Sequence, residues 1–513
     1  MKLSEVIEKI DILDVTGDLT GDVSSICYDS RTCGDDSLFV AIAGLKTDGH
    51  DYITEALAGG ARFIVHEKAF TLPPAFKPSA IIKVCNSRRA LGILGKNFYH
   101  HPSSRLCLIG VTGTNGKTTI TYLLESIFKA AGFPVGVLGT VNYRWGGKVL
   151  PAQNTTPESF EFQQILDAMV TAGVSHVIAE VSSHALDLGR VEDIAFDLGI
   201  FTNLSQDHLD YHETMERYYE AKKRFFTEIL PAGGKEGEYR AVINSDDPWG
   251  RRLLREIGPN GTMTFGTEDG CDVKAAAVTL DRSGIEAFVA AGGNQFTIRS
   301  TLIGKFNLYN ILAATAAALA VGIAPSVIGI GVTALRTVPG RLQKVSDRGQ
   351  PDVFVDYAHT EDALRKVLRN LSEFKRGKMI TVFGCGGDRD HGKRPLMGKA
   401  AVELSDFAIV TSDNPRTEDP LAIIADIEAG ILALGVQRVP PDQLPELAKG
   451  YTVIPDRKEA IKKALSLADN RDIVLVAGKG HEDYQILGTR KITFDDRAVV
   501  REFLAGYTSG RKH

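Results

Sequence analysis

The sequence predicts an α/β protein built from three domains, and three observations carry that prediction. A length of 513 residues suggests roughly three domains of ordinary size. Stretches rich in Pro, Gly and Ser at residues 99–105 and 336–343 are typical of linkers. Short apolar runs alternate with helical patterns, which favours parallel sheets. We therefore expect domains over residues 1–100, 101–340 and 341–513.

Composition and charge are those of a globular protein that does not bind nucleic acid. Hydrophobic residues make up 43% of the chain and charged residues 24%. The net charge of -5 opposes binding to a phosphate backbone. No apolar run approaches the length of a membrane span, and the acidic opening does not resemble a signal peptide. We expect a cytoplasmic protein without membrane insertion that works as a monomer.

The cysteines predict free thiols rather than a covalent framework. The six of them are scattered without a C-x-x-C pair: Cys27, Cys33, Cys85, Cys107, Cys271 and Cys385. Such scatter is typical of reduced thiols in the cytosol and favours neither disulfides nor a zinc site.

A strand, a glycine-rich loop and a helix predict a phosphate-binding P-loop at the start of the central domain. Residues 107–111 read as a short buried strand, and apolar residues at helical spacing follow Lys117. The loop departs from the strict G-x-x-x-x-G-K-[ST] pattern, because Val111 occupies the first glycine position. Small residues nevertheless let backbone N–H groups surround an anion at a helix N-terminus. The alternative is an ordinary glycine turn with an exposed lysine.

We expect this loop to bind ATP. Its predicted phosphate contacts come from Gly113, Thr114, Asn115, Gly116, Lys117, Thr118 and Thr119. Lys117 supplies a positive charge for the outer phosphates, and Thr118 supplies a hydroxyl for Mg²⁺.

Two polar clusters later in the central domain could complete a magnesium site. Glu180 ends one predicted strand, and His208 follows another in the stretch "IFTNLSQDHLDYH". Mg²⁺ prefers oxygen ligands, so a histidine is unusual, and a polar turn with solvated histidines fits the residues equally well. A zinc site has less support, because no cysteine accompanies the histidines.

The C-terminal domain is predicted to be a Rossmann-like α/β domain with one shared binding face. Its strand candidates are residues 353–355, 379–383, 407–410 and 473–477. Each runs into a polar cluster: "DYAH", "GCGGDRD", "TSDNPR" and "GKGHE". Ligands of open parallel sheets bind beyond the carboxyl ends of the strands, so these clusters predict a binding face.

Ten motifs occur in the order found in the Mur ligases of peptidoglycan synthesis, which this chain resembles. They are "GTNGKTT", "NTTPE", "EVSSHAL", "DHLDYH", "GKFNLYN", "GRLQ", "DYAHT", "GCGGDRDHGKRP", "DNPR" and "GKGHE". The resemblance runs from "YDSR" near residue 28 to residue 482 and is strongest to the branch that adds diaminopimelate. It implies an ATP- and Mg²⁺-dependent amide ligase that joins meso-2,6-diaminopimelate to UDP-N-acetylmuramoyl-L-alanyl-D-glutamate through an acyl phosphate.

The resemblance also implies roles for individual residues. Ser30, Leu45, Lys46 and Thr47 would contact uridine, and Asn154, Thr155, Thr156, Ser182 and Arg190 would hold the muramoyl-peptide. Asn307, Arg341 and Asp356 would complete the ATP pocket across the domain boundary. Arg389, Asp413, Asn414, Pro415, Arg416, Gly478 and Glu482 would bind the incoming amino acid. Read from the residues alone, Asn307 more simply caps a helix. The alternative for Arg416, which the residues favour less, is a surface pair with Glu418 or Asp419.

The catalytic set implied by the resemblance is Lys117, Lys222, Glu180 and His208. Thr118, Glu180, His208 and a carbamylated Lys222 (N6-carboxylysine) would gather magnesium. The spacing from Met215 selects Lys222 rather than Lys223 for the modification. A carbamate replaces a repelled ammonium with two hard oxygens beside Mg²⁺.

Three other functions remain as alternatives. An L-lysine-adding Mur ligase would differ only in the amino-acid pocket. A folylpolyglutamate synthase-like ligase would share the loop and the chemistry, but it would carry a folate pocket in place of "YDSR" and "DNPR". A nucleotide-gated binding or motor protein would hydrolyse ATP without needing either acceptor.

Overall fold

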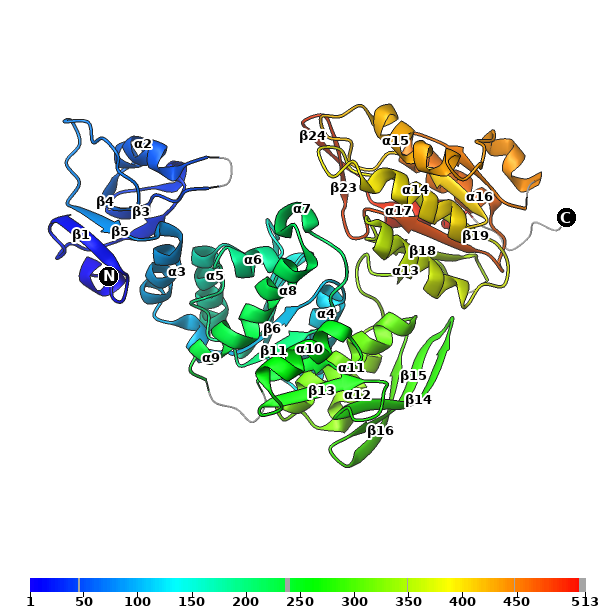
Figure 1. Cartoon of the computed structure of the whole chain (residues 1–513), viewed down its shortest axis with the longest axis horizontal. Helices are drawn as coiled ribbons and strands as arrows, with labels where there is room; N and C mark the ends of the chain where they lie inside the picture. The colour runs from blue at the N-terminus through cyan, green and yellow to red at the C-terminus, as the bar shows by residue number, and fades with distance from the viewer. Residues whose placement is uncertain (45–46, 236–239, 348, 447, 507–513) are drawn as a thin grey trace. The chain divides into compact units, whose positions relative to one another are not determined.

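The computed structural model describes residues 1–44, 47–235, 240–347, 349–446 and 448–506 (Figure 1). It is an α/β protein, as predicted, with sheets of five, eleven and six strands and a separate two-stranded hairpin. The three large sheets fall one into each of the predicted ranges 1–100, 101–340 and 341–513. The boundaries themselves remain predictions.

The chain folds into two compact units. The first comprises residues 1–275, 290–294 and 310–331, and the second comprises residues 276–289, 295–309 and 332–513. The division therefore passes through strand β14 (Val273–Asp281) and helix α11 (Lys305–Ala320).

The N-terminal sheet has the order β1-β5-β4-β3-β2, parallel except for β1. Its strands are β1 (Ile12–Gly17), β2 (Ser25–Cys27), β3 (Ser37–Val40), β4 (Ala61–His66) and β5 (Ala80–Val84). Its helices are α1 (Leu3–Val6), α2 (Ile53–Ala58) and α3 (Ser87–Phe98), with 3₁₀ turns η1 (Ser30–Thr32) and η2 (Gly49–Tyr52). One core packs α1 and α3 on the sheet, and a smaller core packs α2 against it.

One prediction about this region was wrong: Cys27 and Cys33 form a disulfide. The two cysteines flank η1, which turns the chain back and brings their Cα atoms within 5.6 Å, a distance a disulfide spans. The spacing of six residues does not reveal this, because the approach depends on the intervening turn.

The central sheet has the order β16-β15-β14-β13-β12-β11-β6-β10-β7-β8-β9. Its strands are β6 (Cys107–Thr112), β7 (Val135–Leu138), β8 (Asn142–Trp145), β9 (Lys148–Pro151), β10 (His176–Glu180), β11 (Leu198–Phe201), β12 (Ala241–Asn244), β13 (Thr262–Gly266), β14, β15 (Gly284–Ala291) and β16 (Asn294–Ser300). Six neighbouring strands of this sheet run parallel to one another: β13, β12, β11, β6, β10 and β7. Strands β8 and β9 follow β7 at one edge of the sheet, and each is antiparallel to the strand before it. The predicted strand at 107–111 is confirmed as β6, at the centre of the parallel strands.

The helices of the central part connect these strands. They are α4 (Lys117–Ala130), α5 (Ser159–Thr171), α6 (Ser183–Asp187), α7 (Leu209–His212), α8 (Met215–Arg224), α9 (Leu230–Ala232), α10 (Pro248–Ile257), α11 and α12 (Pro325–Ala334), with the 3₁₀ turn η3 (Pro102–Arg105). Helix α8 continues into a π-helical turn, η4 (Phe225–Ile229). No described helix combines the length and apolarity that crossing a lipid bilayer requires.

The C-terminal sheet has the order β17-β18-β22-β19-β20-β21 and is parallel except for β17. Its strands are β17 (Gln343–Lys344), β18 (Asp352–Asp356), β19 (Met379–Phe383), β20 (Phe407–Val410), β21 (Gly450–Val453) and β22 (Ile473–Ala477). Strands β23 (Tyr484–Leu487) and β24 (Arg490–Thr493) form the hairpin beside it, and the 3₁₀ turn η5 (Pro441–Glu446) precedes β21.

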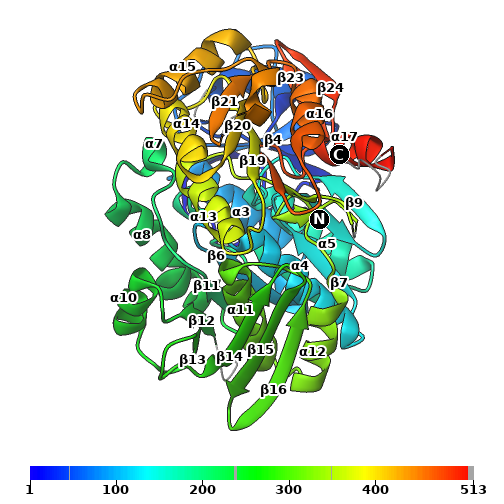
Figure 2. The same cartoon turned by 90° about the vertical axis from the view of Figure 1, so that its right-hand side faces the viewer.

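Helices cover both faces of the C-terminal sheet, as the Rossmann-like prediction requires (Figure 2). One core packs α13 (Glu361–Ser372), α14 (Lys393–Leu404) and α15 (Pro420–Leu432), and the other packs α16 (Arg457–Leu467) and α17 (Asp496–Ala505). Parallel strands buried on both faces read as continuous apolar runs, which is why the sequence revealed them.

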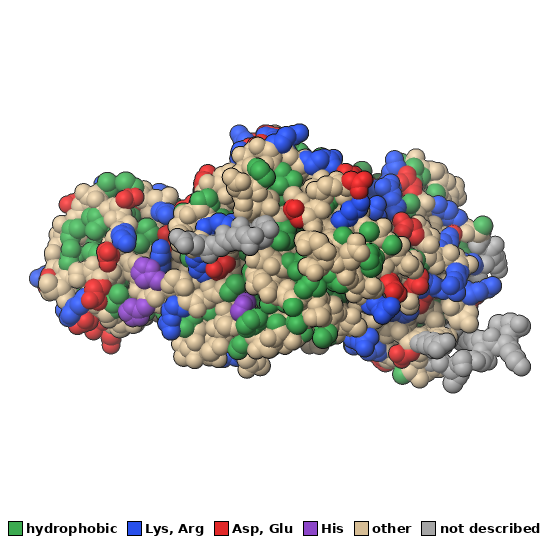
Figure 3. Space-filling view, turned by 90° about the horizontal axis from the view of Figure 1, so that it is seen from below, with side chains coloured by type: hydrophobic (Ala, Val, Ile, Leu, Met, Phe, Trp, Pro, Cys, Tyr) green, Lys and Arg blue, Asp and Glu red, His purple; other side chains and the backbone are tan. Residues whose placement is uncertain are grey.

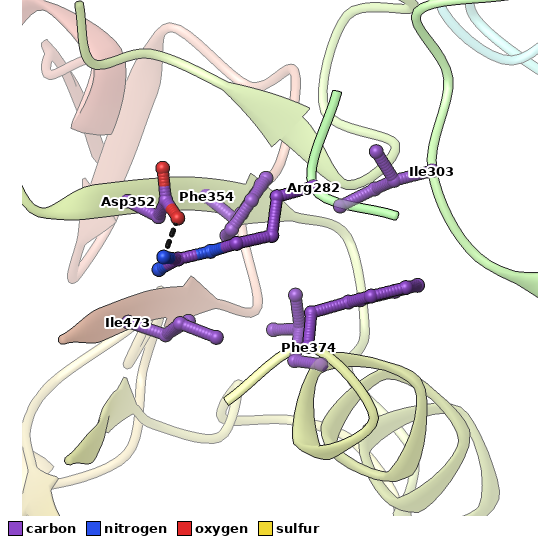
Figure 4. A pocket seen from close by; sticks show the side chains of 7 residues that line it. Arg282, Ile303, Asp352, Phe354, Phe374 and Ile473 are labelled. Carbon is purple, nitrogen blue, oxygen red and sulfur yellow. Dashed lines mark ion pairs between the residues drawn. The ribbon is translucent and has the colours of Figure 1, made fainter. Parts of the chain in front are cut away.

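A small pocket in the second unit is a gap between packed side chains. Arg282 extends into it and forms an ion pair with Asp352, while Ile303, Phe354 and Ile473 line its apolar walls (Figure 4). The space between these side chains does not admit a water molecule, so the pocket offers no room for a ligand. On the surface seen in Figure 3, acidic and basic side chains are intermixed in limited areas, and hydrophobic side chains are scattered between them.

Candidate active site

The glycine-rich loop joins β6 to α4 with a backbone that only glycine allows. Gly113 and Gly116 have φ angles of 137° and 94°, both in the region that excludes most side chains. A Cβ atom on Gly113 would lie 1.9 Å from Thr202 Oγ1, and one on Gly116 would lie 2.3 Å from Asn310 Oδ1. The loop is therefore held close to its neighbours, and α4 begins directly at Lys117, where a helix N-terminus attracts an anion.

Asn203, which was not predicted as a site residue, joins this loop to the end of β11 by hydrogen bonds. The N–H groups of Thr114 and Asn115 donate to the carbonyl and side-chain oxygens of Asn203, at 2.8 and 3.1 Å. Thr202 Oγ1 donates to the Asn115 carbonyl at 2.7 Å. Two of the predicted phosphate-binding N–H groups are therefore engaged within the protein, and they set the shape of the loop.

Two lysines converge on this loop. Lys117 Nζ donates to the carbonyls of Gly113 and Thr114, at 2.7 and 2.9 Å. Lys222 Nζ, from α8, donates to the same Gly113 carbonyl at 3.1 Å and lies 3.5 Å from Thr112 Oγ1. Helix α8 thus turns this lysine toward the interior of the protein.

Burial distinguishes Lys222 from its neighbour. Lys222 is 1% exposed, and burial, helped by the charge of Lys117, holds its pKa well below the usual value. Lys223 forms ion pairs with Glu220 and Glu256 at 2.6 and 3.3 Å, and the hydrogen bond to Glu220 raises its pKa. Of these two lysines, Lys222 is the one whose surroundings favour the neutral amine that carbamylation requires.

Glu180 lies at the carboxyl end of β10, the strand paired with β6, where its partner in the register is Val111. Its carboxylate is 1% exposed and accepts hydrogen bonds from the N–H and hydroxyl of Thr140, at 3.0 and 2.9 Å. A buried carboxylate needs such donors or a cation. Thr140 follows β7 and was not predicted as a site residue.

The "NTTPE" motif packs against the same strand end. Thr155 Oγ1 lies 3.1 Å from Thr140 Oγ1, and Thr156 Oγ1 donates to the Glu180 carbonyl at 2.8 Å. Ser182 N donates to Thr156 Oγ1 at 3.1 Å, and Arg190 Nη1 donates to the Thr156 carbonyl at 3.3 Å.

The remaining residue of this predicted substrate group is Asn154, whose carbonyl accepts the hydroxyl of Tyr143 at 2.6 Å. The structure thus brings Asn154, Thr155, Thr156, Ser182 and Arg190 together beside Glu180.

His208 lies at the start of α7 with a left-handed φ of 54°. Desolvation of its ring, opposed by the charge of Asp207 and reinforced by that of Lys117, lowers its pKa to about 4. At neutral pH the imidazole is therefore uncharged, which is the form that binds a metal. Its ring packs near that of His184, with centroids 4.9 Å apart.

A magnesium site fits these residues without a ready-made cluster. Among the described residues, no three His, Cys, Asp or Glu side chains group closely enough to hold a metal ion. The predicted ligands include only two of those types, Glu180 and His208, and the others are the Thr118 hydroxyl and a modified Lys222. The buried carboxylate and hydroxyl suit a hard cation.

The predicted uridine-binding residues lie in the first unit. Ser30 Oγ donates to Glu55 Oε2 at 3.2 Å, and the carbonyl of Thr47 accepts the Gly44 N–H at 2.9 Å. Leu45 and Lys46 lie outside the described residues.

Three predicted ATP contacts belong to the second unit. Arg341 stacks its guanidinium 4.7 Å from the centre of the Tyr357 ring. Asp356 accepts the N–H groups of Leu342 and Ala358, at 2.5 and 2.8 Å, and burial raises its pKa. Asn307 is the third residue of α11 and donates to the Ile303 carbonyl at 2.9 Å, so it is not the N-cap that the residues alone suggested.

The predicted amino-acid pocket gathers at the carboxyl ends of β19, β20 and β22. Arg416 Nη1 donates to the Gly387 carbonyl at 2.7 Å, and its φ is 53°. It does not form the surface pair considered above, because Glu418 pairs with Arg394 at 2.8 Å and Asp419 caps α15. This guanidinium is partly buried and tied to the neighbouring loop.

The other members of this group lie nearby in the same loops. Gly478 adopts a φ of 116°, and a Cβ there would lie 2.4 Å from Asp413 Oδ2. Glu482 accepts Asn414 Nδ2 at 2.8 Å, and the carbonyl of Pro415 lies 1.9 Å from where Gly387 would carry a Cβ. Arg389 is exposed and donates to the Asp388 carbonyl at 2.9 Å.

The fold and this site define a P-loop α/β protein with a buried lysine and a buried carboxylate beside the phosphate loop. Three family descriptions match the chain in order: "Mur ligase family, catalytic domain" over residues 22–99, "Mur ligase middle domain" over residues 111–318 and "Mur ligase, glutamate ligase domain" over residues 340–480. The chain belongs to the Mur ligase family.

Relatives match over nearly the whole length. UDP-N-acetylmuramoyl-L-alanyl-D-glutamate–2,6-diaminopimelate ligase of Geobacter metallireducens is 45% identical over 503 residues, 98% of each chain. The enzyme of the same name from Clostridium tetani is 44% identical over 98% of this chain and 99% of its own.

Solved structures agree with these relatives. A structure of a ligase with that name has a TM-score of 0.68 at 31% identity, covering 98% of this chain and 99% of its own. A folylpolyglutamate synthase of Mycobacterium tuberculosis, complexed with ADP, shares the fold with a TM-score of 0.59 at 18% identity, covering 82% of this chain and 95% of its own.

Proposed function

We propose that this chain uses ATP to join meso-2,6-diaminopimelate to the D-glutamate side chain of UDP-N-acetylmuramoyl-L-alanyl-D-glutamate. One observation carries the proposal: Lys117 and Lys222 both donate hydrogen bonds to the Gly113 carbonyl of the glycine-rich loop. Full-length relatives named for this reaction support the choice of substrates.

The reaction needs activation, because a carboxylate oxygen is a poor leaving group. The γ-phosphoryl group of ATP passes to the D-glutamate carboxylate, giving an acyl phosphate and ADP. The neutral amine of diaminopimelate then attacks the acyl carbon, the amide bond forms, and phosphate leaves with the former carboxylate oxygen. Lys117 offsets the charge that builds on the transferring group.

The residues around the loop position the acceptor. Asn154, Thr155 and Thr156 would hold the muramoyl-peptide beside Glu180, with Ser182 and Arg190 on the same side. The main contribution of such a site is to hold the D-glutamate carboxylate close to the γ-phosphate of ATP and in the orientation that the reaction needs.

Magnesium would be held by Thr118, Glu180, His208 and the carbamate of Lys222. When bound, it would offset phosphate charge. Gly113 to Thr119 would surround the ATP phosphates, while Asn307, Arg341 and Asp356 would bind the rest of the nucleotide. Ser30 with the 45–47 segment would contact uridine. We further propose that the enzyme acts as a monomer in the cytoplasm on this nucleotide-linked precursor.

The test is ADP release by the purified chain with each acceptor omitted in turn. We expect ADP only when ATP, the UDP-linked dipeptide and meso-diaminopimelate are all present. Steady ADP release without either acceptor would support a nucleotide-driven binding or motor protein instead, and activity with a folate in place of the dipeptide would support a folylpolyglutamate synthase.

A further inference from the structure

Lys479 carries an ammonium group buried inside the candidate amino-acid pocket. It lies between β22 and β23 and has 0% exposure. Its Nζ lies 3.2 Å from Asn414 Oδ1 and 3.1 Å from Glu482 Oε2. Burial of a charge is costly unless it is paired and hydrogen-bonded, so this lysine depends on both partners and fixes both of them.

The hydrogen bonds of Asn414 determine how its amide is turned. Oδ1 accepts from Lys479 and also from the N–H of Ile486, at 3.0 Å. Both lone pairs of that oxygen are therefore used, and Nδ2 must face the other way, where it donates to Glu482 Oε2 at 2.8 Å. One N–H of Nδ2 remains for a ligand.

Glu482 is fixed by the same network through one oxygen. Oε2 accepts from both Asn414 and Lys479. No hydrogen bond joins Oε1 to another residue in the described part of the chain, and 15% of the side chain is exposed. Oε1 is the carboxylate oxygen that an incoming ammonium can reach.

We propose that Lys479 is a positioning residue that sets the specificity of the amino-acid pocket. By binding Oε2 of Glu482, Lys479 orients the other carboxylate oxygen, Oε1, and its positive charge offsets much of the negative charge of the carboxylate. The inference rests on the proposed function and adds one residue to it: Lys479 would favour an amino acid whose far end carries both an ammonium and a carboxylate over one that carries only an ammonium.

The preference follows from competition for Glu482. An amino acid whose far end carries only an ammonium must share the Glu482 carboxylate with Lys479. It also leaves the Arg416 guanidinium without an anion. A far end with both charges offers its carboxylate to Arg416 and its ammonium to Oε1, so both ends are paired. Lys479 therefore weakens the hold on a lone cation more than the hold on a zwitterion.

The experiment compares kcat/KM for meso-diaminopimelate and L-lysine in wild type and Lys479→Met. We expect the variant to lose at least about tenfold of its preference for diaminopimelate. The KM for L-lysine should fall more than the KM for diaminopimelate, because Lys479 no longer competes for Glu482, while kcat and the KM values for ATP and the UDP-linked dipeptide change little. A purely structural role would move all of these together.

Lys491→Met is the matched control. Lys491 is exposed and lies over the ring of Tyr484 at 3.6 Å, the same ring that Lys479 approaches at 5.3 Å. The Lys491→Met substitution also removes one positive charge, but this lysine does not bind Asn414 or Glu482. The preference for diaminopimelate over L-lysine should therefore stay at the wild-type value.

A second variant covers a failure of Lys479→Met to fold. Lys479→Gln keeps a polar group beside Asn414 and Glu482 but carries no charge, so the preference should again be lost. An unchanged preference in either folded variant, or an equal loss in Lys491→Met, overturns the inference. Wild-type protein that ligates neither amino acid overturns the proposed function instead, so the two failures are distinguishable.

Discussion

Lys117 and Lys222 donate to one oxygen, the carbonyl of Gly113, at 2.7 and 3.1 Å. Two ammonium groups at one acceptor would repel each other strongly in a buried site. Burial holds the pKa of Lys222 well below its usual value, so of the two lysines it is the one whose neutral form is favoured. The arrangement therefore assigns different chemistry to the two lysines, a fixed cation and a reactive amine.

Lys117→Ala should abolish ligation while leaving the fold intact, because this side chain contacts the loop and not the core. The expected loss in kcat is on the order of 10²-fold or more. Lys129→Ala is the control, since Lys129 lies on the same helix α4 but is exposed and pairs with Glu125. Product formation and thermal unfolding of both variants check the prediction, and near-normal turnover in Lys117→Ala would refute the P-loop assignment.

Lys222→Ala should be nearly inactive, and Lys223→Ala should be close to normal. The neutral amine of Lys222 can attack CO₂ to form a carbamate, whereas the ion pairs of Lys223 hold it protonated. Wild-type activity should fall when bicarbonate is removed and recover when it is restored, with no recovery in Lys222→Ala. A density map with a bare Lys222 side chain distant from bound magnesium would contradict this role.

Arg416→Ala should raise the KM for meso-diaminopimelate steeply and leave those for ATP and the UDP-linked dipeptide nearly unchanged. An unpaired carboxylate in the pocket costs about 2–5 kcal/mol. Arg438→Ala serves as the control, because Arg438 is an exposed arginine of the same sheet region that pairs loosely with Glu428. A uniform rise in all three KM values would point to a structural role for Arg416.

Reduction of the Cys27–Cys33 disulfide should destabilise the sheet that contains β2 and β3. Opening a loop of this length costs about 2 kcal/mol of unfolding free energy. Urea unfolding followed by hydrogen exchange in these strands, with and without a thiol reductant, measures the effect. Cys85→Ser, a change at an exposed free thiol, should leave the exchange rates unchanged. Equal protection in the reduced and oxidised protein would argue against a stabilising role.

The fold was largely predictable where strands are buried on both faces. The predicted strands at 353–355, 379–383, 407–410 and 473–477 are confirmed as β18, β19, β20 and β22. The hairpin strands β14 to β16 were missed, because most of β14 is exposed and its residues follow no strong apolar pattern.

The candidate site was predictable in its motifs but not in its hydrogen bonds. Asn203, Thr140 and Lys479 form hydrogen bonds with predicted residues from distant parts of the chain. The sequence does not show these contacts, although Asn203 and Lys479 lie within the stretches "IFTNLSQDHLDYH" and "GKGHE". The inward turn of Lys222 likewise depends on how α8 packs, which charge spacing along a helix does not reveal. The roles of the predicted site residues remain proposals that the variants above test.

The most direct test of the central claim is the mass of the product made by the purified chain from ATP, UDP-N-acetylmuramoyl-L-alanyl-D-glutamate and an equal mixture of meso-diaminopimelate and L-lysine. We predict a UDP-linked tripeptide that carries diaminopimelate, formed together with ADP and phosphate. No tripeptide at all would contradict the ligase assignment, and lysine incorporated as efficiently as diaminopimelate would contradict the proposed amino-acid substrate.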